Sequence, residues 1–375
     1  MAFPDDVGVS IVCHDNRDVL AATLASLEAA SCPRSAMLVV DVASTDGTVE
    51  WIRSDFPGIT VRTLERNDGP SPGRNVGIRE CRFPFVFLMD ADVQVQPDTI
   101  ARLRQAMAGD ESIKIGSPIV VHAAAPDMIQ YAEGSLHFIC EAINPWLDRP
   151  LAERGDAPRD IGVAPTCGLL LDRQAAIEVG LFDERYFIGK EDGDFTHRTR
   201  MAGYRILELP SALVLHRSRP RGTWLFYYQI RNRWHFMLKN YQWSTLFLVL
   251  PCLAVHEPLQ ALVLHAQGHA RVYWQAVGGL IALLPSLPRD RALANRIRVE
   301  PDAALLGADR LIVRDDLASH GLVRWGKNAY EGFLRVYWRL LQRTVLNGTR
   351  RAAGRRSRPP RPAPTRSSGG EGPPE

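Results

Sequence analysis

Short apolar runs alternate with segments of helical spacing over the first 107 residues, and this alternation restricts the possible folds most strongly. Strands and helices that follow one another at this pitch form a parallel sheet covered on both faces by helices. Such sheets bind ligands outside the carboxyl ends of their strands. The expected strands are 7–13, 36–42, 59–65 and 84–90, and the expected helices lie within 17–30, 44–54, 71–81 and 97–107.

Changes in sequence character divide the chain into three regions. Residues 1–222 are expected to form the α/β domain, with further strands in 161–173 and 204–216. Residues 223–345 are expected to be helical and associated with a membrane. Residues 346–375 are rich in arginine, proline and glycine, have almost nothing to bury, and are expected to be disordered.

The membrane expectation rests on two apolar segments, 245–266 and 273–287. Neither offers the roughly eighteen uninterrupted apolar residues of a clean spanning helix. We therefore expect helices that lie in the membrane interface or re-enter it, with an ordinary buried pair of helices as the alternative. The residues that interrupt the first segment are Pro251, His256, Glu257 and Pro258.

Charge is distributed unevenly, and this bears on the partners. The whole chain has a formal net charge of +3, whereas 346–375 holds seven arginines and two glutamates. The rest of the chain therefore carries a charge of −2, which does not indicate a nucleic-acid partner. The basic tail is expected to be a solvated linker, with contact to anionic lipid head groups as the alternative.

Two carboxylates, Asp90 and Asp92, stand at the end of the apolar run 85–89. Uncompensated charges beside a buried strand are costly, so we expect them to have a role. Carboxylates are hard oxygen ligands that hold a divalent cation and leave room for water and substrate phosphates. His216 also ends an apolar run and is a candidate third metal ligand. The alternatives are a solvated strand end for the aspartates and a structural or surface role for His216.

A second acidic group opens the helix expected in 191–204. On a helix, Asp194 and Arg198 are four residues apart and can pair. Asp192 points in another direction, is expected to be unpaired, and can face the cleft as a general base that takes a proton from an alcohol. The alternative is that these acids only complement the helix dipole.

The loops after the first three strands are expected to face the same cleft, because the strands are parallel. Asp41 can accept a hydrogen bond from a nucleobase or a ribose, and Arg74 can reach a phosphate. Gly69, Gly73 and Gly77 allow close approach of the backbone. Turn formation explains each of these residues singly, and only their combination favours a nucleotide pocket.

Together these segments resemble the family 2 inverting nucleotide-sugar glycosyltransferases, which have the GT-A fold, a mixed and mainly parallel sheet with flanking helices. The similarity covers roughly residues 7–241. Val42 stands where the family usually has asparagine, and Gly193 is unusual inside the acidic block. The motifs that carry the resemblance occur in the same order as in the family: VSIVCHDNRDVLAATLASL, VVDVASTDGT, GRNVGI, FLMDAD, VGLFDERYF and EDGDFTHRTRMAGYRI.

The resemblance implies roles for individual residues. Asp192 would be the catalytic base. A divalent cation, Mg²⁺ or Mn²⁺, would be bound by Asp90, Asp92 and His216. The residues that would bind the nucleotide-diphosphate sugar donor are Asp41, Asp46, Arg74, Asn75 and Asp90.

The resemblance also implies a reaction and a location. A hydroxyl of a glycan or lipid-linked acceptor would attack the sugar with inversion of the anomeric configuration. The segment IRNRWHFMLKNY and the apolar helices resemble bacterial members that build cell-surface polysaccharides at the cytoplasmic face of the membrane. The competing interpretations are a glycosidase, a nucleotidyltransferase, and a membrane-attached nucleotide-binding module without turnover.

Overall fold

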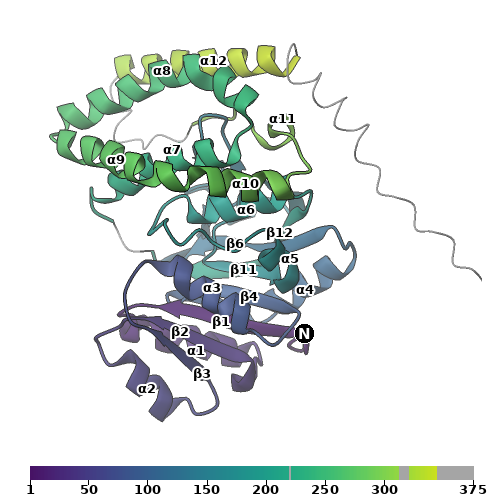
Figure 1. The fold of residues 1–375 in the computed structure, drawn as a ribbon. Helices are drawn as coiled ribbons and strands as arrows, with labels where there is room; N and C mark the ends of the chain where they lie inside the picture. Colours follow the sequence, from purple (N-terminus) through teal and green to yellow (C-terminus); the bar gives the residue numbers. More distant parts are fainter. Residues whose placement is uncertain (219–220, 312–320, 344–375) are drawn as a thin grey trace, which may run out of the picture.

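Ten strands of the α/β part form one mixed sheet between two layers of helices (Figure 1). The computed structural model describes residues 1–218, 221–311 and 321–343, with only the backbone for 321–324. The expected disordered tail, 346–375, lies outside the described residues.

The N-terminal half of the sheet confirms the expected parallel strands. Their order is β4-β1-β2-β3, and every residue of β1 and β2 is buried, as expected for strands covered on both faces. The strands are β1 (Val7–Cys13), β2 (Met37–Val42), β3 (Thr60–Leu64) and β4 (Phe85–Asp90).

The other half of the sheet makes it mixed. β11 (Gly168–Asp172) runs antiparallel between β4 and β6, so β6 and β12 share the direction of the first four strands. The expected strand 161–173 is shortened to β11, because Pro165 cannot donate to a central ladder. The remaining strands are β5 (Val93–Val95), β6 (Ile113–His122), β7 (Ala125–Tyr131), β10 (Arg159–Asp160) and β12 (Arg205–His216), with a separate pair, β8 (Ser135–Leu136) and β9 (Ala142–Ile143).

Helices cover both faces of this sheet with their apolar sides. On one face, residues of α1 (Arg17–Ala29), α2 (Thr48–Asp55) and α4 (Thr99–Ala108) pack against alternate residues of β1, such as Val9 and Ile11. The opposite face is covered by α3 (Pro70–Glu80), α5 (Arg173–Glu178) and α6 (Glu191–Met201).

The C-terminal helices lie beyond α6, at the end of the molecule farthest from β3 (Figure 1). A separate apolar core joins α7, α8 and α12, with Phe236, Val249 and Trp338 among its members. Pro251 and Pro258, which interrupt the apolar segment 245–266, lie inside α8, and the helix continues through both. These helices are α7 (Leu225–Asn240), α8 (Trp243–Ala266), α9 (Ala270–Leu283), α10 (Leu287–Ile297), α11 (Asp302–Leu305) and α12 (Gly321–Leu341).

Candidate active site

A cavity of about 640 Å³ opens at the carboxyl ends of β1, β2 and β4. The strand order changes direction here, since β2 and β4 flank β1 on opposite sides. Open α/β sheets bind their ligands at such a switch point. The cavity is therefore where the predicted site residues are expected to meet.

The structure brings Asp90, Asp92 and His216 to this cavity. Asp90 ends β4, and the chain turns at once into β5, which pairs antiparallel with β12. In that pairing Val93 lies opposite His216. The register therefore places His216 Nε2 3.5 Å from Asp92 Oδ1.

The other imidazole nitrogen of His216 has its own partner, Gln130. His216 Nδ1 lies 2.6 Å from Gln130 Oε1. An amide oxygen only accepts hydrogen bonds, so Nδ1 carries the proton of the neutral ring and Nε2 keeps its lone pair. Burial lowers the pKa of His216, but the hydrogen bond and the charge of Asp92 outweigh it and raise the pKa overall.

This donor set fits a hard divalent cation. Metal-binding histidines usually have their second nitrogen held by another group, as Gln130 holds this one. Within the described residues, no three His, Cys, Asp or Glu side chains already surround a metal position by themselves. Cations such as Mg²⁺ keep several waters and substrate phosphate oxygens as ligands, so a partial set of protein ligands is sufficient.

Arg74, in α3, is buried and bridges the acidic residues. Its Nη2 lies 2.9 Å from Asp90 Oδ1, and its Nη1 lies 3.2 Å from Asp192 Oδ1. Burial lowers the pKa of Arg74, but the charges of Asp90, Asp192 and Glu191 raise it above its ordinary value overall. Arg74 also lines the cavity while its guanidinium holds the two aspartates, and contact between Arg74 and a phosphate stays a prediction.

Asp192 faces the cavity from the first turn of α6, but the expectation that it is unpaired is wrong. The backbone N–H of Thr166 lies 3.2 Å from its Oδ2, and the Thr166 hydroxyl donates to Oδ1. Arg74 is the third partner. These contacts fix the direction of the carboxylate while about 30% of the side chain stays exposed. Asp194 pairs with Arg198 at 2.9 Å, as expected.

Glu191 is a further carboxyl group at the cavity. Burial and the charge of Asp192 raise the pKa of Glu191 to about 8, against the opposing effect of Arg74. Glu191 Oε2 is buried without a hydrogen-bond partner.

Glu191→Gln is expected to make the protein more stable relative to wild type at about pH 8 than at about pH 5. Between its ordinary value of 4.5 and about 8, the folded Glu191 keeps a proton that the unfolded chain releases. Wild-type stability is therefore lost across this window as pH rises, whereas glutamine cannot ionise. Urea unfolding at both pH values measures the difference, and an equal difference at both would contradict this account.

Three predicted donor-binding residues do not line the cavity. Asp41 is buried behind Cys13 and accepts a hydrogen bond from the Ser44 N–H at 3.0 Å. Asp46 accepts from the backbone N–H groups of Arg17 and Thr48, each at 3.1 Å.

Asn75 is also buried, and its amide is used within the protein. It pairs in both directions with the backbone of Phe182 at 2.9 Å and donates to Glu184 at 2.8 Å. Asp46 and Asn75 thus have partners within the protein, and their assignment to donor binding stays a prediction. Asp41 is the neighbour of Val42, which does line the cavity.

Sequence reasoning missed several residues of the site. Thr166 lies in a loop with no recognisable motif, so no sequence signal connects it with Asp192. His14, whose Nδ1 lies 2.7 Å from the carbonyl oxygen of Val42, lines the cavity within a loop that was expected to face it. Phe187 and Trp224 form part of the wall as well. Gly69, at φ 89°, approaches the carbonyl of Phe187 so closely that a Cβ would lie 2.2 Å from its oxygen.

Comparison with known proteins confirms the resemblance. The sequence model of the Glycosyl transferase family 2 matches residues 9–158. N-acetylglucosaminyl-diphospho-decaprenol L-rhamnosyltransferase of Mycobacterium tuberculosis is 29% identical over 214 residues, which cover 52% of this chain and 70% of that protein. Pre-mycofactocin glycosyltransferase of the same organism is 27% identical over 348 residues, which cover 89% of this chain and 66% of that protein.

Comparison with solved structures confirms the fold class. The crystal structure of GalNAc-T7 with UDP, GalNAc and Mn²⁺ matches with a TM-score of 0.51 at 17% identity. The match covers 63% of this chain and 48% of that one. The chain thus has a GT-A-like fold and resembles the family 2 glycosyltransferases.

Proposed function

We propose that this chain transfers a sugar, with inversion, from a nucleotide-diphosphate sugar to a hydroxyl of a glycan or lipid-linked acceptor in cell-surface polysaccharide synthesis. The observation that carries this proposal is the convergence of Asp90, Asp92, His216 and Asp192 on one cavity at the switch point of the sheet. The names of the two mycobacterial relatives support the reaction class, and the name of the rhamnosyltransferase, which includes a diphospho-decaprenol, supports a lipid-linked acceptor.

In this proposal the residues at the end of β4 act on the donor. Asp90, Asp92 and His216 Nε2 would hold Mg²⁺ or Mn²⁺, which neutralises charge on a diphosphate leaving group when it is bound. Arg74 keeps Asp90 in place. Asp41, behind the wall formed by Cys13 and Val42, would contact the base once the loop side chains adjust to the nucleotide.

Asp192 is the residue proposed to act on the acceptor. It accepts the proton of the hydroxyl as that oxygen attacks the anomeric carbon, and the diphosphate leaves from the opposite face. The bond to the acceptor forms as the bond to the diphosphate breaks, so the configuration inverts and no enzyme nucleophile is needed. Thr166 and Arg74 hold Asp192 in the direction of the cavity.

The test is a transfer assay with UDP-, GDP- and dTDP-sugars in the presence of Mn²⁺, followed by NMR of the product's anomeric proton. The proposal predicts a product whose anomeric configuration is opposite to that of the donor. Retention would contradict the inverting mechanism. Hydrolysis of glycosides without any nucleotide requirement would favour the glycosidase alternative.

We also propose that the chain binds the cytoplasmic face of the membrane through α8 and α9. Among the described helices, α8 is the one whose length and apolar composition would allow it to cross a membrane. Only 22% of its most apolar 18-residue segment is buried. Its polar residues point inward: Arg233 of α7 contacts Glu257 and Gln260, and His256 contacts Tyr330 of α12. The large apolar residues that α8 exposes are Trp243, Phe247, Leu250, Val255, Leu259, Leu262 and Val263.

A helix that faces water exposes its polar side chains and buries its apolar ones, whereas α8 exposes apolar side chains and turns polar ones toward the protein. This arrangement is the one expected beside lipid tails. The exposed apolar surface continues on α9 at Trp274 and Ile281, each 61% exposed. Near the start of α8, the Arg291 guanidinium lies 4.0 Å from the ring centroid of Trp243, a pair suited to the head-group region. Glu257, the one Asp, Glu, Lys or Arg residue of α8, pairs with Arg233 inside the protein, which favours a helix lying along the membrane.

Replacing Phe247, Leu262 and Trp274 together by serine is expected to abolish binding to vesicles of phosphatidylcholine and phosphatidylglycerol. These side chains are 61–69% exposed, so the folded state should lose little stability. Leu147→Ser, at an exposed leucine outside these helices, is the control and should bind as wild type does. Vesicle co-sedimentation measures this, and undiminished binding by the triple variant would exclude the surface.

A further inference from the structure

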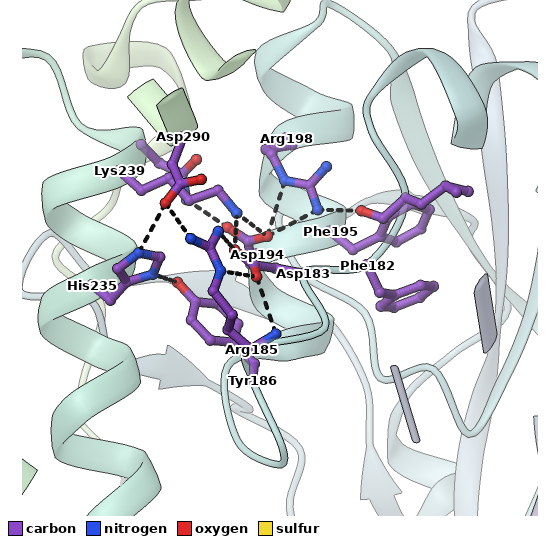
Figure 2. A network of polar contacts seen from close by, with 12 residues as sticks. Phe182, Asp183, Arg185, Tyr186, Asp194, Phe195, Arg198, His235, Lys239 and Asp290 are labelled. Atoms are coloured by element: carbon purple, nitrogen blue, oxygen red, sulfur yellow. Dashed lines mark hydrogen bonds and ion pairs between the residues drawn. The ribbon is translucent and has the colours of Figure 1, made fainter. Parts of the chain in front are cut away.

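One face of α7 is polar and yet buried. Asn232, His235, Lys239 and Asn240 recur at helical spacing and are buried. Figure 2 shows His235 and Lys239 pointing toward Tyr186, Asp183 and Asp194. Charged and amide side chains are rarely buried unless they are fully paired. Their partners therefore indicate what this face of α7 does.

The main partner is Asp194, whose side chain is fully buried in the first turn of α6. Its Oδ2 accepts from Arg198 Nε at 2.9 Å and from Lys239 Nζ at 2.9 Å. Its Oδ1 accepts from Asn240 Nδ2 at 2.8 Å. Two of these three partners belong to α7, so α7 anchors the first turn of α6 (Figure 2).

Lys239 makes a second contact, which extends the anchor to the loop before α6. Its Nζ also lies 2.8 Å from Asp183 Oδ2, and Asp183 pairs with Arg185 at 2.6 Å. Arg185 reaches Asp290 of α10 at 2.5 Å. Within this network three carboxylates, Asp183, Asp194 and Asp290, are balanced by three cations, Arg185, Arg198 and Lys239.

A further α7 residue, Asn232, fixes the chain immediately before α6. The Asn232 amide is buried and donates to the carbonyls of Ile188 and Gly189 at 3.0 and 2.7 Å. Arg231 donates to the carbonyl of Arg185 at 2.7 Å. The entry to α6 and its first turn are therefore both attached to α7.

This attachment bears directly on the proposed base. Successive residues of a helix are rotated by about 100°, so Asp192 and Asp194 project from nearly opposite sides of α6. Asp194 is held by α7 on one side, and Asp192 faces the cavity on the other. A rotation or shift of this turn would displace the Asp192 carboxylate from its Thr166 and Arg74 contacts.

We propose that α7 is part of the catalytic unit and that Lys239 is a positioning residue for Asp192. This inference rests on the proposed function only for the identity of the base. The boundary at residue 222 then marks a change in sequence character and not the end of the catalytic unit, because that unit extends through Asn240. Lys239 touches neither donor nor acceptor and acts through Asp194.

The experiment compares Lys239→Met with Lys114→Met in the full-length chain. Lys114 also pairs with one aspartate, Asp172, at 2.8 Å, but it lies in β6 away from α6. In the transfer assay with the donor that wild type uses, Lys239→Met is expected to lower kcat roughly 10- to 100-fold with a smaller change in donor KM.

A double variant, Lys239→Met with Asp183→Asn, separates positioning from charge balance. The double variant removes the Asp183 carboxylate, one of the two that pair with Lys239, but Asp194 still lacks the cation that α7 supplies. We expect the double variant to recover thermal stability and not kcat. Recovery of both would show that Lys239 only balances charge and would overturn the proposal.

Hydrogen exchange provides a readout that needs no activity. Lys239→Met is expected to speed exchange of the backbone amides in 191–194 relative to Lys114→Met, and unchanged exchange would overturn the proposal. If wild type transfers no sugar while exchange in 191–194 responds, the function proposed above fails and the anchoring of α6 by α7 stands.

Discussion

Asp192→Asn is expected to lower kcat by about 10²- to 10⁴-fold, the range that a positioned general base contributes. Asparagine keeps the shape of the side chain and can still accept the hydrogen bond from the Thr166 N–H. It cannot accept the proton of the acceptor hydroxyl. Donor binding, which relies on the β4 end of the cavity, should therefore change by less than about threefold.

Steady-state kinetics and calorimetric titration with the nucleoside diphosphate together test this expectation. Asp127→Asn, at an exposed aspartate of β7, is the matched control and should behave as wild type. A variant of Asp192 that retains kcat would assign the base elsewhere. A variant that loses kcat and nucleotide affinity equally would show that Asp192 serves the structure of the whole cavity.

Arg74→Met is expected to lower the free energy of unfolding by about 3–5 kcal/mol, as when one partner of a buried ion pair is removed. Arg74 is 4% exposed and has Asp90 and Asp192 as direct partners, with Glu191 Oε1 3.9 Å away. Without Arg74, the carboxyl groups of Asp90, Asp192 and Glu191 lie close together with no cation between them. Transfer activity is expected to fall as well, because the guanidinium holds the end of β4 and the start of α6 in register.

Denaturant unfolding measures the stability, and Arg79→Met is the control. Arg79 lies in the same helix with its side chain 55% exposed, and its contact with Glu184 is long, at 3.9 Å. Its replacement should cost less than about 1 kcal/mol. If the two variants were equally stable, the bridge formed by Arg74 would not hold the site together.

Much of the fold could be predicted because local pattern and tertiary environment agree in the N-terminal half. Strands buried on both faces are continuous apolar runs, and β1 and β2 show this over their full length. The agreement fails at 161–167, where apolar residues form a loop because Pro165 interrupts the ladder. In α8 the prolines did not end the helix, which shows that packing against α7 and α12 overrides a local breaker.

The candidate site was only partly predictable, for a physical reason. Asp90 and His216 end strands, and Asp92 lies in the short turn directly after Asp90, so their position follows from the sheet alone. The partners of Asp192 follow from contacts between segments that are distant in sequence: Arg74 is 118 residues away and Thr166 is 26 residues away. Asp46 and Asn75 belong to motifs that match those of the family, but in the structure their side chains stabilise a turn and connect loops through hydrogen bonds.

The direction of the polar residues in the C-terminal helices could not be predicted either. Hydropathy reports how apolar a segment is and does not report which side faces the protein. Glu257 and His256 were expected to interrupt a membrane segment, yet they point inward toward Arg233 and Tyr330. The buried face of α7 is polar for a similar reason, since its partners lie in the loop 182–190 and in α6.

The most direct test of the proposed donor site is calorimetric titration of the full-length chain with UDP, GDP, dTDP, CDP and ADP, with and without Mn²⁺. We predict that one nucleoside diphosphate binds tightly, that binding requires the cation, and that Asp92→Ala weakens it at least about tenfold, the change expected when a cation ligand is lost. Failure of all five to bind, with and without Mn²⁺, would contradict the donor site and leave Asp90 and Asp92 as a charged strand end.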